Sequence, residues 1–179
     1  PPPLFFFNQI TDYPMLRSLV GSEMCIRDSA GTLISVESRP EHAEVGKSNM
    51  DRLREVLPEF PEWHLIESDL AEIGSEVSEI CVGLDAAIVD LAEPWTVLSE
   101  IEPLLRVGGR VACYCPTSSQ LERSWDACEE LGMGGEWSGE IIERRWSKAS
   151  KGGVRPGNQP MGHTAFILIS AKVSPKEEE

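Results

Sequence analysis

Hydrophobic and polar positions follow two different periods along the chain from Gly31 onward. Short apolar runs bounded by turn residues are typical of strands, and apolar residues three or four positions apart are typical of helices. Residues 85–91 are almost continuously apolar, as in a central parallel strand. The other expected strands are residues 33–37, 63–67, 110–115, 141–146 and 163–171.

Helical spacing separates most of these runs. One helix is expected to begin at Pro40, because proline suits a first turn, and to place Ala43 and Met50 on one face. A second is expected from Pro94 to a Gly-Gly pair at 108–109. A third is expected to be capped by Thr117 or Ser119, whose capping-box partners are Gln120 and Glu122.

Alternating strands and helices predict an α/β fold with a mostly parallel, Rossmann-like sheet. The last two runs, 141–146 and 163–171, have no helix between them, so we expect a C-terminal antiparallel hairpin at one edge. The length of 179 residues suits one domain. Residues 30–173 are expected to form it, and residues 174–179 are expected to be a disordered acidic tail.

Residues 1–29 follow neither period. The segment LVGSEMCIRDS resembles translated sequencing-adaptor sequence, so we expect this lead not to be native protein. The alternative is an irregular N-terminal arm. No apolar run approaches the roughly 20 residues of a membrane helix, so no membrane segment is expected.

Charge and cysteines change this picture in one respect. The net charge of −14 disfavours a nucleic-acid partner. However, no Asp or Glu lies between Arg144 and Lys176, where seven Lys or Arg occur, so one basic face on an acidic body is compatible with the sequence. The five cysteines form no CxxC pair or zinc spacing, which predicts reduced thiols in a cytoplasmic protein and no metal site.

Ligands of such sheets bind beyond the carboxyl ends of the strands. There Glu37 could accept hydrogen bonds from ribose hydroxyls, although a solvated loop glutamate is equally common. His42 could border the same site or be an ordinary surface histidine. Ser68 and Asp69 follow the second strand, where Asp69 could bind an exocyclic amine of adenine or cap a turn.

Two further strand ends carry stronger candidates. Asp90 lies at the tip of the most apolar strand, where a carboxylate is costly without a partner or a task. Tyr114 and Trp95 could stack an extruded base, although as core aromatics they would need no ligand. Arg145, Trp146, Lys148 and Arg155 combine cations with an aromatic ring, which suits phosphate contacts and stacking or simply a solvated loop.

Four segments together resemble the tRNA (adenine-N1)-methyltransferases, a family of class I methyltransferases. They are SVESRPEHAEVGKSNM, IVDLAEPW, LLRVGGRVACYCPTSSQ, and IIERRW followed by MGHTAFIL. The resemblance implies S-adenosylmethionine as methyl donor, tRNA as substrate and a homotetramer. It implies that Asp90 and Tyr114 border the target adenine. The implied cofactor-binding residues are Glu37, His42, Ser68, Asp69 and Asp90, and the implied RNA-binding residues are Arg145, Trp146, Lys148, Arg155 and His163.

One departure from the family stands out. A class I methyltransferase opens with a strand and a glycine-rich turn that holds the methionine part of the cofactor, but Gly21 is the only glycine before Gly31. We therefore expect that first strand and its loop to be missing and the chain to bind S-adenosylmethionine weakly. Two alternatives remain: a non-catalytic tRNA-binding subunit, and a class I methyltransferase with another substrate.

Overall fold

The computed structural model describes residues 4–8, 31–56, 60–68, 73–142, 144, 146–148, 150–156 and 165–174. Seven strands form one sheet in the order β3-β2-β1-β4-β5-β9-β6, and β7 and β8 form a separate two-stranded sheet. The bounds of the seven are β1 Leu4–Asn8, β2 Thr32–Val36, β3 Glu62–Ile66, β4 Leu84–Val89, β5 Leu105–Cys115, β6 Gly134–Gly139 and β9 Phe166–Ala171.

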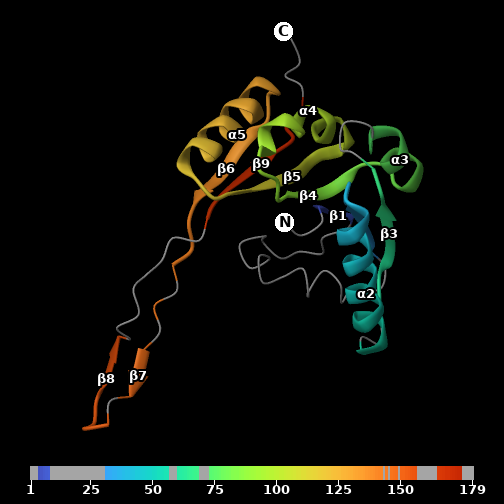
Figure 1. The fold of residues 1–179 in the computed structure, drawn as a ribbon. Helices are drawn as coiled ribbons and strands as arrows, with labels where there is room; N and C mark the ends of the chain where they lie inside the picture. The colour runs from blue at the N-terminus through green and yellow to red at the C-terminus, as the bar shows by residue number, and fades with distance from the viewer. Residues whose placement is uncertain are drawn as a thin grey trace.

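Helices cover the sheet on both faces. Figure 1 shows α3 (Ile73–Ile80), α4 (Leu98–Ile101) and α5 (Ser118–Glu130) above the sheet, with α2 (Pro40–Val56) beside β2 and β3. Successive strand residues point to opposite faces. Accordingly Leu33 packs in one cluster with Met50 of α2, while Ile34 packs in the main core with Ile73 of α3. The expected α/β fold is therefore confirmed.

The parallel part of the sheet fixes one functional edge. β2 pairs parallel with β3, and β4 pairs parallel with β5. β1 pairs antiparallel with both β2 and β4, so β2 and β4 also run in the same direction. The last residues of β2, β3, β4 and β5 therefore lie along one side of the sheet, which we call the carboxyl edge.

β1 occupies the place between β2 and β4 but runs against both neighbours. Leu4 lies opposite Val36, and Asn8 lies opposite Thr32. The chain thus leaves β1 at the edge opposite the carboxyl edge. A first strand that runs parallel to its neighbours and ends in a glycine-rich turn, as the family resemblance implies, is not found among the described residues.

The C-terminal strands differ in position from the expectation. β9 pairs antiparallel with both β5 and β6, so the antiparallel edge is confirmed. Its outer strand is β6, seven residues before the expected start at Ile141. The chain turns into β6 directly after α5, at Gly132 with φ 71°. With Trp137 as its one large apolar residue, β6 gives almost no periodic signal.

The second expected helix is shorter than the sequence suggested. Residues 94–104 form a 3-10 turn η3 (Pro94–Thr96), α4 and a second turn η4 (Glu102–Leu104). The Gly-Gly pair lies inside β5, where the Gly108 N–H donates to the Lys172 carbonyl at 2.8 Å and the Lys172 N–H donates to the Gly109 carbonyl at 2.8 Å. A Cβ on Gly109 would lie 2.6 Å from the Leu84 carbonyl oxygen, so this crossing requires glycine.

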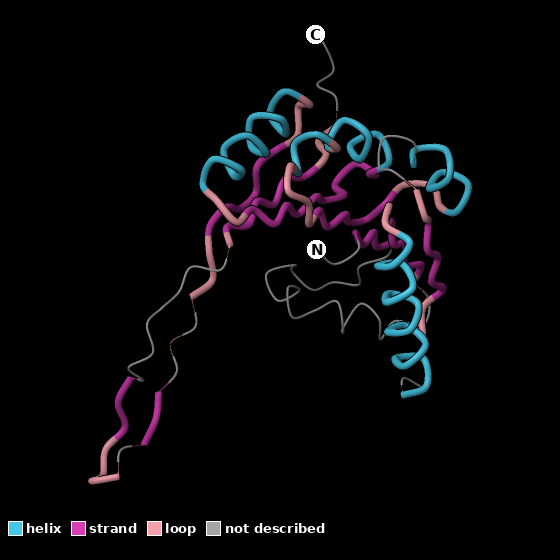
Figure 2. The backbone as a smooth tube through the Cα atoms, in the orientation of Figure 1, coloured by secondary structure: helices cyan, strands magenta, loops and turns pink. Residues whose placement is uncertain are grey.

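Between β6 and β9 the chain leaves the body of the protein. β7 (Trp146–Lys148) and β8 (Val154–Pro156) pair antiparallel with each other. Figures 1 and 2 show this pair at the far end of a long excursion, well away from the seven-stranded sheet. We call the described part of residues 141–156 the basic arm.

Candidate functional site

The first group at the carboxyl edge is centred on Glu37, directly after β2. Its side chain is buried, and its backbone N–H donates to the Ile66 carbonyl at 3.1 Å. Its Oε1 accepts hydrogen bonds from the backbone N–H and the Nε of Arg39, both at 3.1 Å. Its Oε2 lies 3.4 Å from Nη2 of Arg39 and 3.9 Å from Nδ1 of His42.

These contacts decide the charge of Glu37. Burial by itself would raise the pKa of the carboxyl group, but the hydrogen bonds and positive charge of Arg39, together with His42, hold that pKa below its ordinary value. Glu37 is therefore a carboxylate at neutral pH. A buried carboxylate with oxygens at the end of a parallel strand is suited to accept hydrogen bonds from vicinal hydroxyl groups.

Asp90 and Tyr114 lie at the ends of two neighbouring strands at the same edge. In the parallel pair of β4 and β5, Val89 is opposite Cys113. Asp90 directly follows Val89 at the end of β4, and Tyr114 follows Cys113 in β5. Because side chains alternate between faces, these two lie on the face opposite the main core, to which Val89 and Cys113 belong. Both side chains are half-buried.

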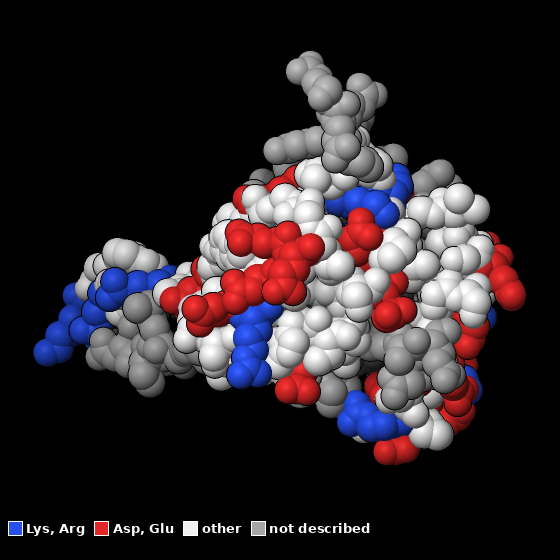
Figure 3. All heavy atoms as spheres, turned by 90° about the horizontal axis from the view of Figure 1, so that it is seen from above, with Lys and Arg blue, Asp and Glu red and all other residues white. Residues whose placement is uncertain are grey.

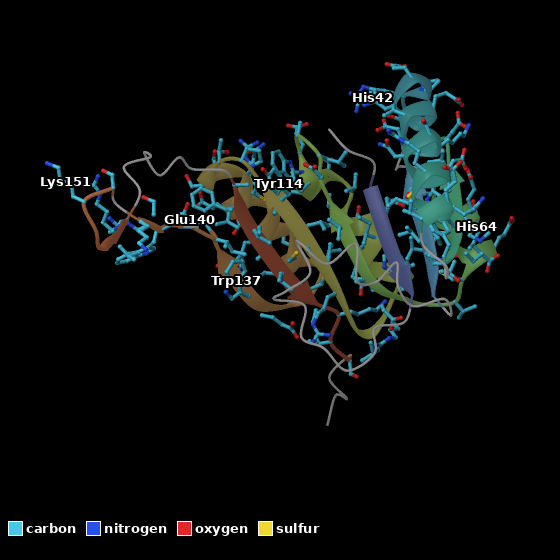
Figure 4. The ribbon with its side chains drawn as sticks, turned by 90° about the horizontal axis from the view of Figure 1, so that it is seen from below. His42, His64, Tyr114, Trp137, Glu140 and Lys151 are labelled. Carbon is cyan, nitrogen blue, oxygen red and sulfur yellow. The ribbon has the colours of Figure 1, made fainter. Side chains whose placement is uncertain are left out.

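The environment of Asp90 shifts the titration of its carboxyl group. Burial raises the pKa of its carboxyl group above the ordinary value. A carboxyl group with a raised pKa at the end of a parallel strand is a candidate functional group. Val36 also belongs to the main core, so the next residue, Glu37, lies on the same face of the sheet as Asp90 and Tyr114. Figure 4 shows Tyr114 near the end of its strand and His42 near the N-terminal end of α2.

The remaining predicted cofactor residues are only partly described. Ser68 is half-buried two residues after the end of β3, and β3 pairs with β2 so that Ile66 is opposite Val36. Ser68 thus follows the strand that neighbours β2, after which Glu37 lies. Asp69 lies outside the described residues.

Trp95 is half-buried in η3, and its ring faces the Arg123 guanidinium, with Cζ 5.1 Å from the ring centroid. Arg123 therefore already covers one face of this ring. Of the two aromatic residues that the sequence offered for stacking a base, Tyr114 lies next to Asp90 in the strand register, while Trp95 is held against α5.

The basic arm carries the predicted RNA-binding residues away from the carboxyl edge. Trp146, Lys148 and Arg155 are exposed, and Trp146 retains 62% of its accessible surface. Figure 3 shows Lys and Arg side chains gathered on the arm and Asp and Glu side chains over the helical face of the body. Figure 4 places Lys151 far from Tyr114 and His42. Arg145 and His163 lie outside the described residues.

Two residues that contact the site were not proposed for it from the sequence. Arg39 was missed because its position two residues after Glu37 gives no helical or strand signal. Gln120 was recognised only as a capping residue, a role confirmed by the capping box with Thr117. Its side chain also reaches Ala92, which no local pattern shows.

The described part of the chain holds neither a metal-binding cluster nor a membrane-spanning helix. No group of three or more His, Cys, Asp or Glu side chains there is arranged to hold a metal ion. No helix there is both long and apolar enough to cross a membrane. Cys113, Cys115 and Cys128 are buried free thiols, and burial raises the pKa of each, whereas Cys25 lies outside the described residues.

Sequence relatives agree with the resemblance. No model of a known protein family matches the chain. The chain is 28% identical to the tRNA (adenine(57)-N(1)/adenine(58)-N(1))-methyltransferase TrmI of Methanocaldococcus jannaschii, over 83% of this chain and 60% of that protein. It is 28% identical to the TrmI of Thermus thermophilus, over 77% of this chain and 51% of that protein. The chain thus spans about half the length of these curated relatives.

Solved structures agree with the fold. An S-adenosylmethionine-dependent O-methyltransferase from Thermotoga maritima superposes with a TM-score of 0.70 and 25% identity, over 88% of this chain and 56% of that chain. The tRNA (m1A58) methyltransferase TrmI of Aquifex aeolicus gives 0.64 and 22% identity, over 79% and 53%. The chain therefore has a class I methyltransferase fold and is similar in sequence to TrmI-type tRNA (adenine-N1)-methyltransferases.

Proposed function

We propose that this chain is most of the catalytic domain of an enzyme that methylates N1 of adenine in tRNA, with S-adenosylmethionine as methyl donor. The observation that carries the proposal is the position of Asp90 and Tyr114 at the carboxyl edge, each directly after one of the paired residues Val89 and Cys113. The curated relatives support the substrate, since their names specify adenine 57 or 58 of tRNA. We also propose a cytoplasmic location, where such tRNA substrates are found.

The described residues fit one half of the methyl donor. The buried Glu37 carboxylate offers acceptors for the two ribose hydroxyls, with Ser68 at the neighbouring strand end. His42 and Asp69 complete the proposed cofactor set. The methionine half has no comparable support, because β1 runs antiparallel and its outgoing chain leaves at the opposite edge. This is consistent with the proposal that residues 1–29 are not native and that residues 30–173 are a partial domain.

The residues of this chain then divide the work. S-adenosylmethionine, when bound, supplies an electrophilic methyl group. The Asp90 carboxylate accepts a hydrogen bond from the exocyclic amino group of adenine and stabilises the positive charge that develops on the ring as N1 is alkylated. Tyr114 stacks on the extruded base and offsets part of the few kcal/mol that extrusion costs. Orientation of the two bound reactants supplies much of the remaining rate.

The basic arm is proposed to hold the tRNA. The predicted RNA-binding residues combine positive charges, which suit phosphate contacts, with an aromatic ring, which suits base stacking. They are Trp146, Lys148 and Arg155 of the arm, together with Arg145 and His163. The body that carries the carboxyl edge is acidic, so an RNA strand is attracted to the arm rather than to the helical face. We further propose that the full-length enzyme is a homotetramer, as the family resemblance implies.

The proposal is tested with two forms of the protein. The 179-residue chain, with millimolar S-adenosylmethionine, should bind the donor weakly, and calorimetry showing micromolar affinity would contradict this. A chimera with the N-terminal region of the M. jannaschii relative should transfer methyl groups to a tRNA transcript, detected as 1-methyladenosine by mass spectrometry. No 1-methyladenosine despite tight donor binding would refute the substrate assignment.

A second candidate function is methyl transfer to another acceptor. It is favoured by the likeness to the O-methyltransferase from Thermotoga maritima, with a TM-score of 0.70. Transfer to small hydroxylated molecules but not to tRNA would support it. A third possibility is a tRNA-binding subunit without catalysis. An unchanged methylation rate in an Asp90→Asn variant would support it.

A further inference from the structure

The segment after β4 is attached to the start of α5 by one side chain. Residues 90–93, which we call the β4–η3 loop, carry Asp90 and lead into η3. The Nε2 of Gln120 donates a hydrogen bond to the carbonyl oxygen of Ala92 at 2.8 Å. The two residues are 28 positions apart, so this contact exists only in the folded chain.

The same side chain also closes the first turn of α5. The Oε1 of Gln120 accepts hydrogen bonds from the backbone N–H of Thr117 at 2.8 Å and from the Thr117 hydroxyl at 2.7 Å. The Gln120 N–H donates to Oγ1 of Thr117 at 3.3 Å. The carbonyl end of the Gln120 amide is thus used by the helix cap, and its NH₂ end is used by the β4–η3 loop.

Because one amide group makes both contacts, the structure explains why residue 120 is a glutamine. Glutamate and glutamine both serve as the third residue of a capping box, because both offer an acceptor to the N-cap N–H. Only glutamine also has a donor on the same group. A carboxylate at this position would present a second acceptor to the Ala92 carbonyl and repel it.

A second contact lies on the same face of α5. Gln120 and Arg123 are three residues apart, which places them as neighbours on the helix surface. Arg123 lies over the Trp95 ring, with Cζ 5.1 Å from its centroid. The start of α5 therefore contacts the segment after Asp90 at two points, Ala92 and Trp95.

We propose that Gln120 is a positioning residue that holds the β4–η3 loop, and with it Asp90, in place at the carboxyl edge. The inference rests on the proposed function in one respect only, which is that Asp90 contacts the target base. The hydrogen bond itself joins residues that belong to neither the proposed cofactor contacts nor the basic arm.

The test compares two substitutions that separate the cap from the loop contact. Gln120→Glu keeps the capping acceptor and removes the donor to Ala92. The N–H groups of Thr96 and Val97, which donate within η3 to Glu93 and Pro94, report on the loop. Their hydrogen exchange is expected to accelerate about fivefold, the loss of one ordinary hydrogen bond, while exchange within α5 is unchanged.

Thr117→Ala is the matched control, because it weakens the cap and leaves the Gln120 contact with Ala92 available. It is expected to accelerate exchange at Gln120 and Leu121 but not at Thr96 or Val97. Unchanged exchange at Thr96 and Val97 in Gln120→Glu overturns the proposal. Equal acceleration there by Thr117→Ala also overturns it, since Gln120 would then act only as a cap.

The pKa of the Asp90 carboxyl group distinguishes a residue that positions Asp90 from one that only stabilises the fold. In the neutral variant Gln120→Met the loosened loop admits water, so the pKa of the Asp90 carboxyl, followed by carbon-13 NMR, is expected to fall toward its ordinary value. An unchanged pKa contradicts the proposal. Because neither experiment needs donor or tRNA, a failure to methylate adenine refutes the proposed function and leaves the loop contact standing.

Discussion

The carboxyl edge and the basic arm belong to one chain but are built by opposite means. The edge is positioned by core residues: Val89, Val111 and Cys113 are fully buried, and the strand register between them places Asp90 beside Tyr114. The arm has a two-stranded sheet of its own, and its large apolar side chains Trp146 and Val154 are exposed.

The difference indicates where rigidity is required. An isolated two-stranded hairpin is marginally stable in water, so the arm is suited to adapt to a large partner. A methyl transfer needs its groups within a fraction of an ångström of their places, which a packed sheet provides. Substitutions at the edge should therefore change the rate, and substitutions in the arm should change affinity.

The largest effect is expected from Asp90→Asn in the chimera. Loss of the carboxylate at the developing charge should lower the single-turnover methylation rate about 100- to 1000-fold, with little change in tRNA affinity. Asp126→Asn, on the exposed surface of α5, is the matched control and should be silent. An unchanged rate in Asp90→Asn would favour a binding role without catalysis at this edge.

The next largest effect is expected in the arm. Replacing Lys148, Lys151 and Arg155 together by alanine should weaken tRNA binding about tenfold or more at low salt and reduce the salt dependence, since each lost phosphate contact lowers the slope by about one. The melting temperature should not change. Filter binding at several salt concentrations measures the effect.

The control for the arm variant removes the same charge elsewhere. A triple alanine variant of Lys47, Arg52 and Arg54 on α2 also lowers the net charge by three but leaves the arm intact. If both variants weaken binding equally, the arm is not a specific RNA contact and only the overall charge matters.

A smaller effect on stability is expected from Arg39→Ala. The buried Glu37 carboxylate then keeps the backbone N–H of residue 39 but loses the hydrogen bonds and charge of the guanidinium group. Because Arg39 is partly solvated, the loss should be about 1 kcal/mol in urea unfolding. In the wild type the contribution of Glu37 is present above its ordinary pKa of 4.5 and is lost as pH falls through the lowered pKa.

The variant should therefore differ most from the wild type at neutral pH, and the difference should shrink as pH falls below 4.5. Arg39→Lys retains a positive charge and should recover part of the loss. A pH-independent difference would mean that Arg39 stabilises the protein by packing rather than through the charge of Glu37.

The smallest expected effect is a gain in stability in Asp90→Asn. The raised pKa of Asp90 means that its ionised form opposes folding. The free energy of unfolding is therefore reduced progressively as pH rises above the ordinary pKa of 3.8. The variant should melt about 2 °C higher than the wild type at pH 7, with no gain at pH 3. Lower stability at pH 7 would show that the carboxylate is structurally paired.

The pattern of the sequence by itself determined the parallel half of the fold. The apolar run of β4, the helix that begins at Pro40 and the Thr117–Gln120 capping box are local signals, and each appears where it was expected. The carboxyl-edge residues Glu37, Asp90 and Tyr114 followed from the same signals. Residues at the ends of buried parallel strands must meet at one edge, whatever their separation along the chain.

Only the tertiary structure decided the rest. β6 has too few apolar residues to be recognised, and its place is set by pairing with β9. The direction of β1 and the bond from Gln120 to Ala92 depend on which segments lie side by side, which no local period encodes. Periodicity reports which face of an element is buried, whereas pairing partners and long-range hydrogen bonds are chosen when those faces pack.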